Sequence, residues 1–382
     1  MLLDATSGGE YVLRLEAQAR RGVLSPLPQT LGGLCRSIGP MPTLHPPLQP
    51  MLCRSADEIP AAPGLVYEPK WDGFRCIVFR QGESLHLESR NSLPLQRYFP
   101  ELLDPLRAAL PEEAVVDGEI VIAGPRGLDF DALQLRLHPA ESRVRMLAAE
   151  IPATFIAFDL LALGEEDLRE RPLAERTILL RAALTPVHQV ALTPQTTDPQ
   201  EAASWFVRYE GAGCDGVVAK PLDSTYRSGD RGWIKVKHLR TVDVVVGGYR
   251  KDLKIEAVAS LLLGLYDADG VLHHVGHTSS FSAAERRDLL ALLRPLEGGI
   301  SFGAGRTPGG PSRWTRGRET DWVAVRPELV CEVAFDHLQG NRFRHASRFL
   351  RWRPDKAAAE CGYDQLLPPH PFDLARILGS SA

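Results

Sequence analysis

One short segment carries the residue types needed for covalent chemistry. Residues 68–75 read EPKWDGFR, which places Lys70 just before an aspartate, a glycine and an arginine. A deprotonated lysine amine is a nucleophile that can attack an α-phosphate and hold a nucleoside monophosphate through a P–N bond. Since the pKa of a free lysine is about 10.4, we expect nearby cations to lower the pKa of Lys70. The segment therefore predicts a covalent carrier of a nucleotide.

Lysine is scarce in this chain, which makes each one informative. Only seven of the 44 lysine and arginine residues are lysines. Arginine stays protonated and cannot act as an amine nucleophile, so a lysine in such a chain is a candidate for chemistry that arginine cannot perform. Lys235 and Lys237 alternate in the stretch 233–237, and alternate residues of a strand point to the same face. Two ammonium groups there would stabilise charge on a phosphate and lower the pKa of Lys70.

Six further motifs follow Lys70 in order along the chain. They are SRNS (89–92), DGEI (117–120), FDLL (158–161), DGVVAK (215–220), WIKVK (233–237) and RPDK (353–356). Together with residues 70–75, this series resembles the signature of the covalent nucleotidyltransferases. The closing RPDK and the chain length make the sequence similar to the ATP-dependent DNA ligases, in particular the short bacterial C-type ligases, over about residues 41–366.

The resemblance implies a role for each motif. Lys70 is the nucleophile that carries AMP, and Phe158 is a platform on which adenine stacks. Arg75 approaches the nucleotide phosphates or the 5′-phosphate of a nick, whereas Arg90 touches the ribose or the DNA phosphate. The full set of residues implied to bind the nucleotide is Glu68, Arg75, Arg90, Glu119, Phe158, Arg231, Lys235, Lys237, Arg353, Asp355 and Lys356.

The resemblance also implies a metal site and a moving C-terminal motif. Glu119 contacts the ribose hydroxyls and helps to bind Mg²⁺ or Mn²⁺ with Asp215, which stands where the family more often has glutamate. Residues 353–356 close over the nucleotide, orient the pyrophosphate leaving group and then swing away so that DNA can bind. Arg227 and Arg231 both lie near the place of a phosphate-binding arginine, and the sequence does not choose between them.

The motifs fall in segments with the patterns of short strands and helices. Strands are expected over 74–80, 85–89, 114–123, 154–163, 215–220 and 233–237. Helices are expected over 98–110, with a break at Pro105, and over 172–184 and 200–210. After a boundary near 238–243, further strands are expected over 244–249, 259–266, 271–275 and 329–335. SAAE at 282–285 is a capping box that opens a helix to about Leu293.

These elements predict an α+β protein of two domains. An adenylation (nucleotidyltransferase) domain of antiparallel sheets and helices is expected over 41–240. Several short strands with one helix then indicate a β-barrel OB-fold domain over 241–367. Residues 1–40 are predicted to be a poorly ordered N-terminal extension, and 368–382 a C-terminal tail.

Composition favours a soluble cytoplasmic protein. The net charge is −4, and no apolar run is long enough to span a bilayer. None of the six cysteines forms a C-x-x-C pair, so a zinc module is not indicated and reduced thiols are expected. Basic residues gather in 341–356, among three aromatic side chains, and in 306–318, which suits contact with a phosphate backbone.

We therefore predict an ATP-dependent DNA ligase that seals nicks in duplex DNA, between a 5′-phosphate and a 3′-hydroxyl, through a lysyl-AMP intermediate. ATP is the expected co-substrate. Nicked duplex DNA and DNA-repair proteins are the expected partners of a monomeric enzyme. RNA end joining and mRNA capping use the same lysine-linked chemistry and stay open as alternatives, as does a non-catalytic nucleic-acid-binding relative.

Overall fold

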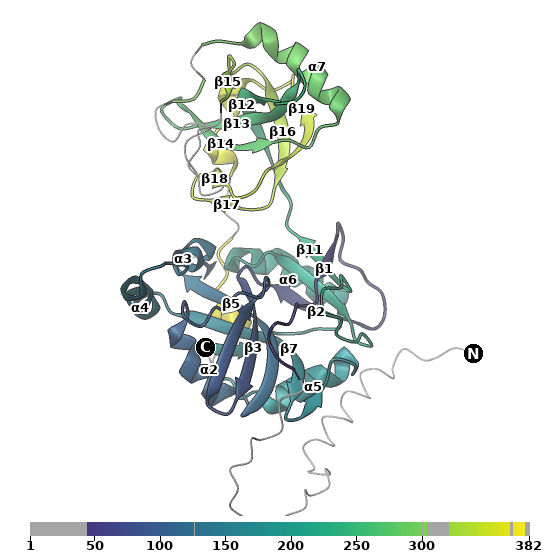
Figure 1. Ribbon diagram of the computed structural model, residues 1–382. Helices are drawn as coiled ribbons and strands as arrows, with labels where there is room; N and C mark the ends of the chain where they lie inside the picture. Colours follow the sequence, from purple (N-terminus) through teal and green to yellow (C-terminus); the bar gives the residue numbers. More distant parts are fainter. Residues whose placement is uncertain (1–43, 126, 300, 304–320, 367–369, 379–382) are drawn as a thin grey trace, which may run out of the picture. The chain divides into compact units, whose positions relative to one another are not determined.

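The computed structural model describes residues 44–125, 127–299, 301–303, 321–366 and 370–378. The chain divides into two compact units (Figure 1): unit 1 contains Met1–Lys237 and His370–Ala382, and unit 2 contains His238–Pro369. The predicted extension over 1–40 and the basic stretch 306–318 lie outside the described residues.

Unit 1 is built on two β-sheets. The smaller sheet has the strand order β1-β11-β10-β2, in which β1 and β11 are parallel and the other neighbours antiparallel. The larger sheet has the order β4-β3-β5-β7-β8, with β6 added beside β5 and β9 beside β7. The strands are β1 (Cys53–Ala56), β2 (Leu65–Lys70), β3 (Phe74–Gln81), β4 (Ser84–Ser89), β5 (Glu113–Gly124), β6 (Gly127–Leu128), β7 (Ala153–Leu163), β8 (Glu166–Asp167), β9 (Val190–Leu192), β10 (Gly216–Pro221) and β11 (Trp233–Lys237).

Helices cover the outer faces of both sheets. On the smaller sheet, Val217 and Ala219 pack with Ala202 of α6 (Pro199–Arg208). On the larger sheet, the apolar face packs with α2 (Leu103–Ala109) and α5 (Leu173–Ala183). Because side chains alternate along a strand, the other residues of each strand face the space between the two sheets. The remaining helices of unit 1 are α3 (Phe130–Leu135), α4 (Glu141–Glu150) and α8 (Ala375–Leu378).

A buried ion pair fixes the strand that carries Phe158. The guanidinium of Arg176 on α5 donates to both carboxylate oxygens of Asp159, at 2.8 and 2.9 Å, and both side chains are fully buried. Arg176 also donates to the carbonyl oxygens of Arg171 and Ser224, so the pair ties β7, α5 and the loop after β10 together.

Replacing Arg176 by methionine should lower the free energy of unfolding by about 3–5 kcal/mol, because it leaves the Asp159 carboxylate buried without its partner. Urea denaturation of the purified variant measures this change. Arg181→Met on the exposed side of the same helix is the matched control and should cost less than about 1 kcal/mol. Equal losses for the two variants would contradict this account of the pair.

Unit 2 is a small barrel with the OB-fold strand order. Its sheet runs β14-β13-β12-β16-β19, and a bridge between Thr278 and Ser347 brings the end of β14 beside the start of β19. The capping box at Ser282 and Glu285 is present and opens α7 (Ala283–Leu293), as predicted. The strands are β12 (Arg240–Lys251), β13 (Val258–Tyr266), β14 (Leu272–Thr278), β15 (Val323–Ala324), β16 (Val330–Phe335), β17 (Leu338–Gln339), β18 (Arg342–Phe343) and β19 (Arg348–Trp352).

One local expectation differs from the structure. The helix expected over 98–110 is a 3₁₀ turn at Pro100–Leu102 followed by α2, and Pro105 lies in the first turn of α2, where proline is tolerated. Unit 2 begins at His238, within the boundary expected near 238–243, and β12 begins at Arg240. Asp243 lies in β12 and pairs with Arg353 and Lys356, as described below.

Candidate active site

Lys70 lies at the end of β2, where the chain crosses from the smaller sheet to β3 of the larger one. Its Nζ is 2.6 Å from Oδ2 of Asp215, and Nζ of Lys237 is 2.9 Å from the same oxygen. Strand pairing builds this cluster, because Lys70 and Lys237 are both register partners of Gly216, the residue after Asp215. The structure therefore brings the first, fifth and sixth motifs together at one strand end.

The pKa of Lys70 is raised, which contradicts the expectation from sequence. Burial alone would lower it, but the Asp215 carboxylate in direct contact, together with Glu119, favours the charged ammonium. The prediction that Lys235 and Lys237 depress the pKa of Lys70 is therefore wrong for this arrangement, since the nearest charge is a carboxylate. For Lys235 itself, burial and then the ammonium groups of Lys237 and Lys70 lower the pKa.

Carboxylates gather around Lys70. Oxygen atoms of Asp72 and Asp215 lie within 4.8 Å of each other, and Glu119 lies outside this close group. Burial raises the pKa of Glu119 to about 7, although the charges of Arg75 and Lys70 oppose that shift. Carboxylate oxygens are the donors that hard divalent cations prefer, so these residues fit Mg²⁺ or Mn²⁺. The proximity of Asp72 to Asp215 was not found from the sequence, because it depends on the pairing of β2 with β10.

Arg75 is held by a buried network. Its guanidinium donates to both oxygens of Asp117 at 2.5 Å, and its centre lies 4.4 Å from the ring centroid of Phe158. The Tyr226 hydroxyl donates to the same carboxylate at 2.6 Å and accepts from the backbone N–H of Met51 at 2.9 Å. Neither Asp117 nor Tyr226 was predicted as a site residue. Asp117 is the first residue of the DGEI motif and could have been found from it, whereas Tyr226 lies in none of the motifs.

Phe158 is packed rather than open. The ring is 5% exposed and lies edge-on to Trp233, with the two ring centroids 6.2 Å apart. Nζ of Lys220 lies 4.4 Å from the Phe158 ring centroid and 2.7 Å from Oε2 of Glu68. Oε1 of Glu68 accepts from the Gln195 amide at 2.7 Å. Adenine can stack on Phe158 only if this packing opens, and sequence reasoning missed Lys220 and Gln195 as the partners of Glu68.

The remaining predicted cations of unit 1 lie at the surface. Arg90 directly follows β4 and is exposed. Arg231 is exposed in the loop between β10 and β11 and donates to the carbonyl oxygen of Cys53 at 3.1 Å. Arg227, in the same loop, is also exposed. The structure therefore brings both arginines to one loop near β1.

The RPDK motif is anchored within unit 2 by a residue that the sequence analysis did not single out. Both oxygens of Asp243, near the start of β12, accept from Arg353 at 2.9 Å, and one of them lies 2.9 Å from Nζ of Lys356. Arg353 also pairs with Asp355 at 2.8 Å, and this contact lowers the pKa of Asp355 to about 2. The Gln365 amide donates to the backbone carbonyl of Asp243 at 3.0 Å.

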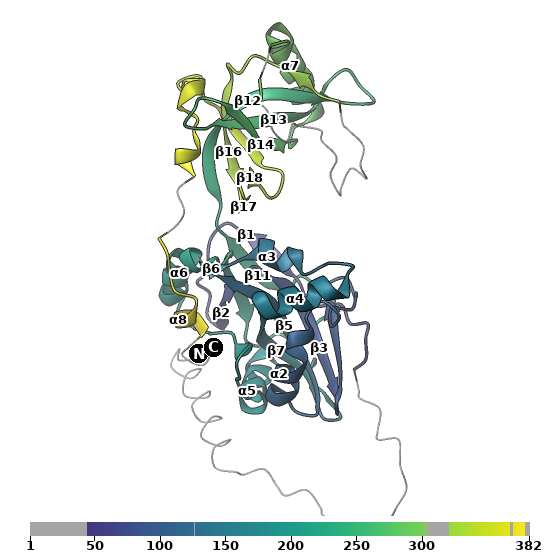
Figure 2. The same cartoon turned by 90° about the vertical axis from the view of Figure 1, so that its left-hand side faces the viewer.

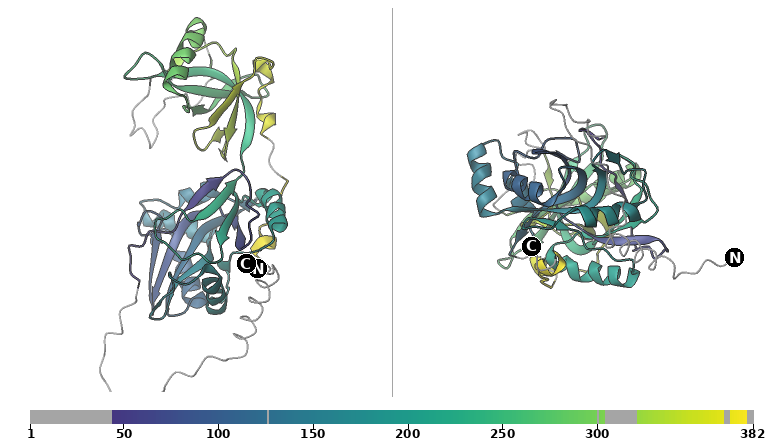
Figure 3. Two further views of the ribbon diagram at one scale, coloured as in Figure 1. Left: turned by 90° about the vertical axis from the view of Figure 1, so that its right-hand side faces the viewer. Right: turned by 90° about the horizontal axis from the view of Figure 1, so that it is seen from below.

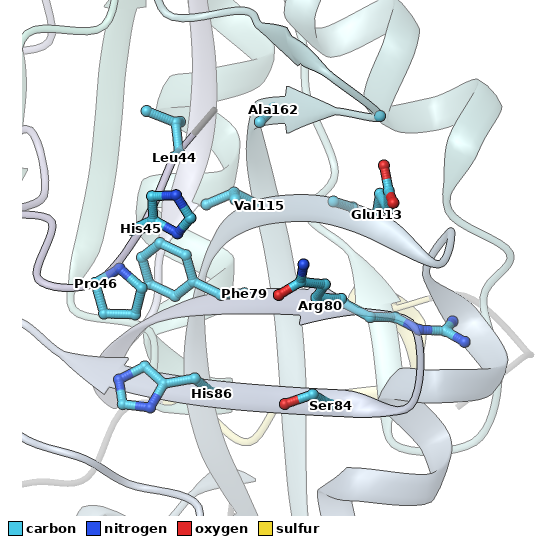
Figure 4. Close-up of a pocket in the computed structure, with 13 residues that line it drawn as sticks. Leu44, His45, Pro46, Phe79, Arg80, Ser84, His86, Glu113, Val115 and Ala162 are labelled. Carbon is cyan, nitrogen blue, oxygen red and sulfur yellow. The ribbon is translucent and has the colours of Figure 1, made fainter. Parts of the chain in front are cut away.

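A cavity of about 100 Å³ lies apart from these residues, against β3, β4 and β5 (Figure 4). His45, Phe79, His86 and Glu113 are among its lining residues, and it contains none of the predicted site residues. It is therefore not the candidate nucleotide site.

The comparisons with known proteins agree with this geometry. Residues 50–237 match the family model of the ATP dependent DNA ligase domain, and residues 254–356 match that of the ATP dependent DNA ligase C terminal region. The chain belongs to the ATP-dependent DNA ligase family. The first match ends at Lys237, the last residue before unit 2 begins.

Two curated ligases cover most of the chain. The chain is 50% identical to DNA ligase C2 of Mycolicibacterium smegmatis over 341 residues, which cover 85% of this chain and 96% of that ligase. It is 49% identical to DNA ligase C of Mycobacterium tuberculosis over 350 residues, covering 87% and 97%. A solved Lig E DNA ligase structure shares the fold, with a TM-score of 0.50 at 20% identity, covering 80% of this chain and 99% of that one. The recognition of a short bacterial ATP-dependent DNA ligase and of its fold class is thereby confirmed.

Proposed function

We propose that this ligase seals 5′-phosphate/3′-hydroxyl nicks in duplex DNA in three displacements, with AMP carried on Lys70. First the Lys70 amine attacks the α-phosphate of ATP, so that a P–N bond forms and pyrophosphate leaves. The 5′-phosphate of the nick then takes AMP from Lys70, and the 3′-hydroxyl finally displaces AMP. The observation that carries this proposal is the position of Lys70 at a strand end, with Asp215 and Lys237 in contact.

The neighbours of Lys70 supply the charge that phosphoryl transfer requires. Lys235 and Lys237 point to the same side of β11 as Lys70 does on β2, so they are suited to neutralise the α-phosphate. The Lys70 ammonium must lose a proton before it attacks, and the Asp215 carboxylate at 2.6 Å is the nearest acceptor. We assign Mg²⁺ or Mn²⁺ binding to Asp215 and Glu119, with Asp72 close by. The ion would neutralise charge on the phosphates.

The other predicted residues are assigned to nucleotide and DNA contacts. Glu68 lies beside the Phe158 platform and is suited to the adenine amino group, and Glu119 to the ribose hydroxyls. Arg75, Arg90 and Arg231 are assigned to phosphates. Arg353, Asp355 and Lys356 are assigned to the pyrophosphate leaving group, which requires the OB-fold unit to close during the first step and to open before DNA binds.

The cellular context is inferred from more general features. No helix of the described residues is long and apolar enough to cross a membrane. Five cysteines of the described residues are free thiols, which suits a reducing compartment, and we assign the ligase to the cytoplasm. We further propose that it acts as a monomer in DNA repair with partner proteins. If efficient nick sealing requires an added partner protein, that result would support this role. Tight binding of nicked DNA by the isolated ligase would contradict it.

The raised pKa of Lys70 gives a direct test of its environment. Removing the negative charge of Asp215 should lower the Lys70 pKa, because the carboxylate stabilises the ammonium. The pH dependence of amine labelling of Lys70, followed by mass spectrometry, should therefore shift to lower pH in Asp215→Asn. Labelling of the exposed Lys254 in the same sample is the internal control. An unchanged Lys70 profile would contradict the proposed ion pair.

Sealing of a singly nicked DNA duplex with ATP and Mg²⁺ tests the proposed function. Sealed strand, with adenylated DNA as an intermediate, is the expected result. An enzyme that forms lysyl-AMP yet seals only nicked RNA would favour RNA end joining, and a preference for GTP over ATP would favour capping chemistry. Absence of any covalent nucleotide would favour a non-catalytic relative.

A further inference from the structure

The C-terminal strap, residues 370–378, belongs to unit 1 and packs beside α6 and the turn that follows it. α8 lies beside α6 in two different views (Figures 2 and 3). Leu374 and Ile377 are 9% and 6% exposed, and the Phe372 ring centroid lies 5.3 Å from that of Tyr209. The backbone N–H of Phe372 donates to the carbonyl oxygen of Gly211 at 3.2 Å. Residues 370–378, within the C-terminal tail expected over 368–382, are therefore docked on unit 1.

The strap backbone lies so close to Gly211 that only glycine fits at this position. A Cβ atom at Gly211 would lie 1.8 Å from the carbonyl oxygen of His370 and 3.0 Å from the backbone nitrogen of Phe372. The strap therefore approaches the turn Tyr209–Ala212 more closely than any side chain there would allow. An alanine at this position leaves unit 1 able to form its turn but excludes the strap.

The strap belongs to an apolar cluster that includes the residues flanking the reacting groups. Leu374 and Ile377 belong to the same apolar cluster as Trp71 and Cys214. Trp71 directly follows Lys70, and Cys214 directly precedes Asp215. The Trp71 indole N–H donates to the Thr193 hydroxyl at 3.0 Å. The Trp71 ring is therefore positioned both by this hydrogen bond and by the apolar cluster to which the strap belongs. Phe158 belongs to a different cluster, which contains no strap residue.

We propose that the C-terminal strap is a positioning element for the adenylation step, acting through Trp71 and Cys214 on Lys70 and Asp215. This inference rests on the proposed function of Lys70. Displacing the strap removes Leu374 and Ile377 from the apolar cluster that contains Trp71 and Cys214. Phe158, on which the base is assigned to stack, lies in a different cluster. The strap therefore governs how well the amine is aligned with the α-phosphate rather than how tightly ATP is bound.

Single-turnover adenylation with labelled ATP and Mg²⁺ tests the proposal in the full chain. Gly211→Ala and Leu374→Asp should each lower the rate of lysyl-AMP formation at saturating ATP by roughly 10- to 100-fold, with the ATP concentration for half-maximal rate changed by less than about threefold. Arg376→Ala, on the exposed side of the strap, is the matched control and should keep the wild-type rate.

A peptide of residues 370–382 distinguishes contact from tethering. Added to a chain that ends at Pro369, the peptide should restore most of the adenylation rate, because the strap acts by packing and not by its covalent link to unit 2. Failure of the peptide to restore the rate, or wild-type rates in Gly211→Ala and Leu374→Asp, would overturn the proposal. A wild-type chain that forms no lysyl-AMP would instead contradict the proposed function itself.

Discussion

Replacing Lys70 by arginine is expected to abolish formation of the covalent enzyme–AMP and to reduce ATP-dependent sealing by at least about 10⁴-fold. Arginine keeps a positive charge beside Asp215, so the ion pair that closes the strand end is preserved. Its guanidinium stays protonated and offers no amine lone pair to the α-phosphate. Transfer of label from [α-³²P]ATP to the protein, followed on a denaturing gel, measures the loss.

The same variant should still join a nick that already carries AMP on its 5′-phosphate, within about tenfold of wild type. That step breaks the bond between AMP and the DNA phosphate and makes no bond to Lys70. Lys254→Arg, at an exposed position of unit 2, is the control and should behave as wild type in both assays. A Lys70→Arg protein that becomes labelled would show that another residue carries AMP.

Replacing Asp243 by alanine should lower the rate of enzyme–AMP formation by roughly 100-fold and leave the joining of a pre-adenylated nick within about threefold. Asp243 is the shared acceptor of Arg353 and Lys356, and without it the two cations repel each other and lose their fixed geometry. These cations are assigned to pyrophosphate, which leaves only in the first step. Rates of the two steps, measured separately on the same preparation, give the comparison.

Two variants separate this effect from simple destabilisation of the barrel. Asp243→Asn keeps an oxygen acceptor without the charge and should recover part of the lost rate. Glu332→Gln removes an acid of the same sheet whose partner Arg351 is exposed, and it should leave both steps unchanged. Equal losses in both steps for Asp243→Ala, or a loss matched by Glu332→Gln, would contradict the assigned role of Asp243.

Several strands of unit 1 were predictable because apolar or alternating segments stand between turn residues. Lys235 and Lys237 face one side of β11 because alternate residues of a strand share a face, and Lys70 comes beside Asp215 once β2 pairs with β10. The OB-fold was predictable from short strands around one capped helix, and the capping box at Ser282 placed that helix correctly.

The parts that sequence reasoning missed depend on contacts between segments far apart in the chain. Asp243 was not singled out, because nothing near it in sequence indicates its partners Arg353 and Lys356. Tyr226 has no local pattern that points to Asp117. The direction in which the Lys70 pKa shifts was also missed. This shift depends on the distance of each charge from Lys70, and not on the number of cations in the motifs.

Identification of the residue that carries AMP tests the central claim most directly. The ligase would be incubated with ATP and Mg²⁺, digested, and its peptides examined by tandem mass spectrometry under conditions that preserve the P–N bond. A parallel sample would be chased with nicked DNA. AMP on Lys70, lost during the chase as sealed strand accumulates, is the predicted result. AMP on any other residue, or sealed strand formed without a covalent enzyme–AMP, would contradict the account.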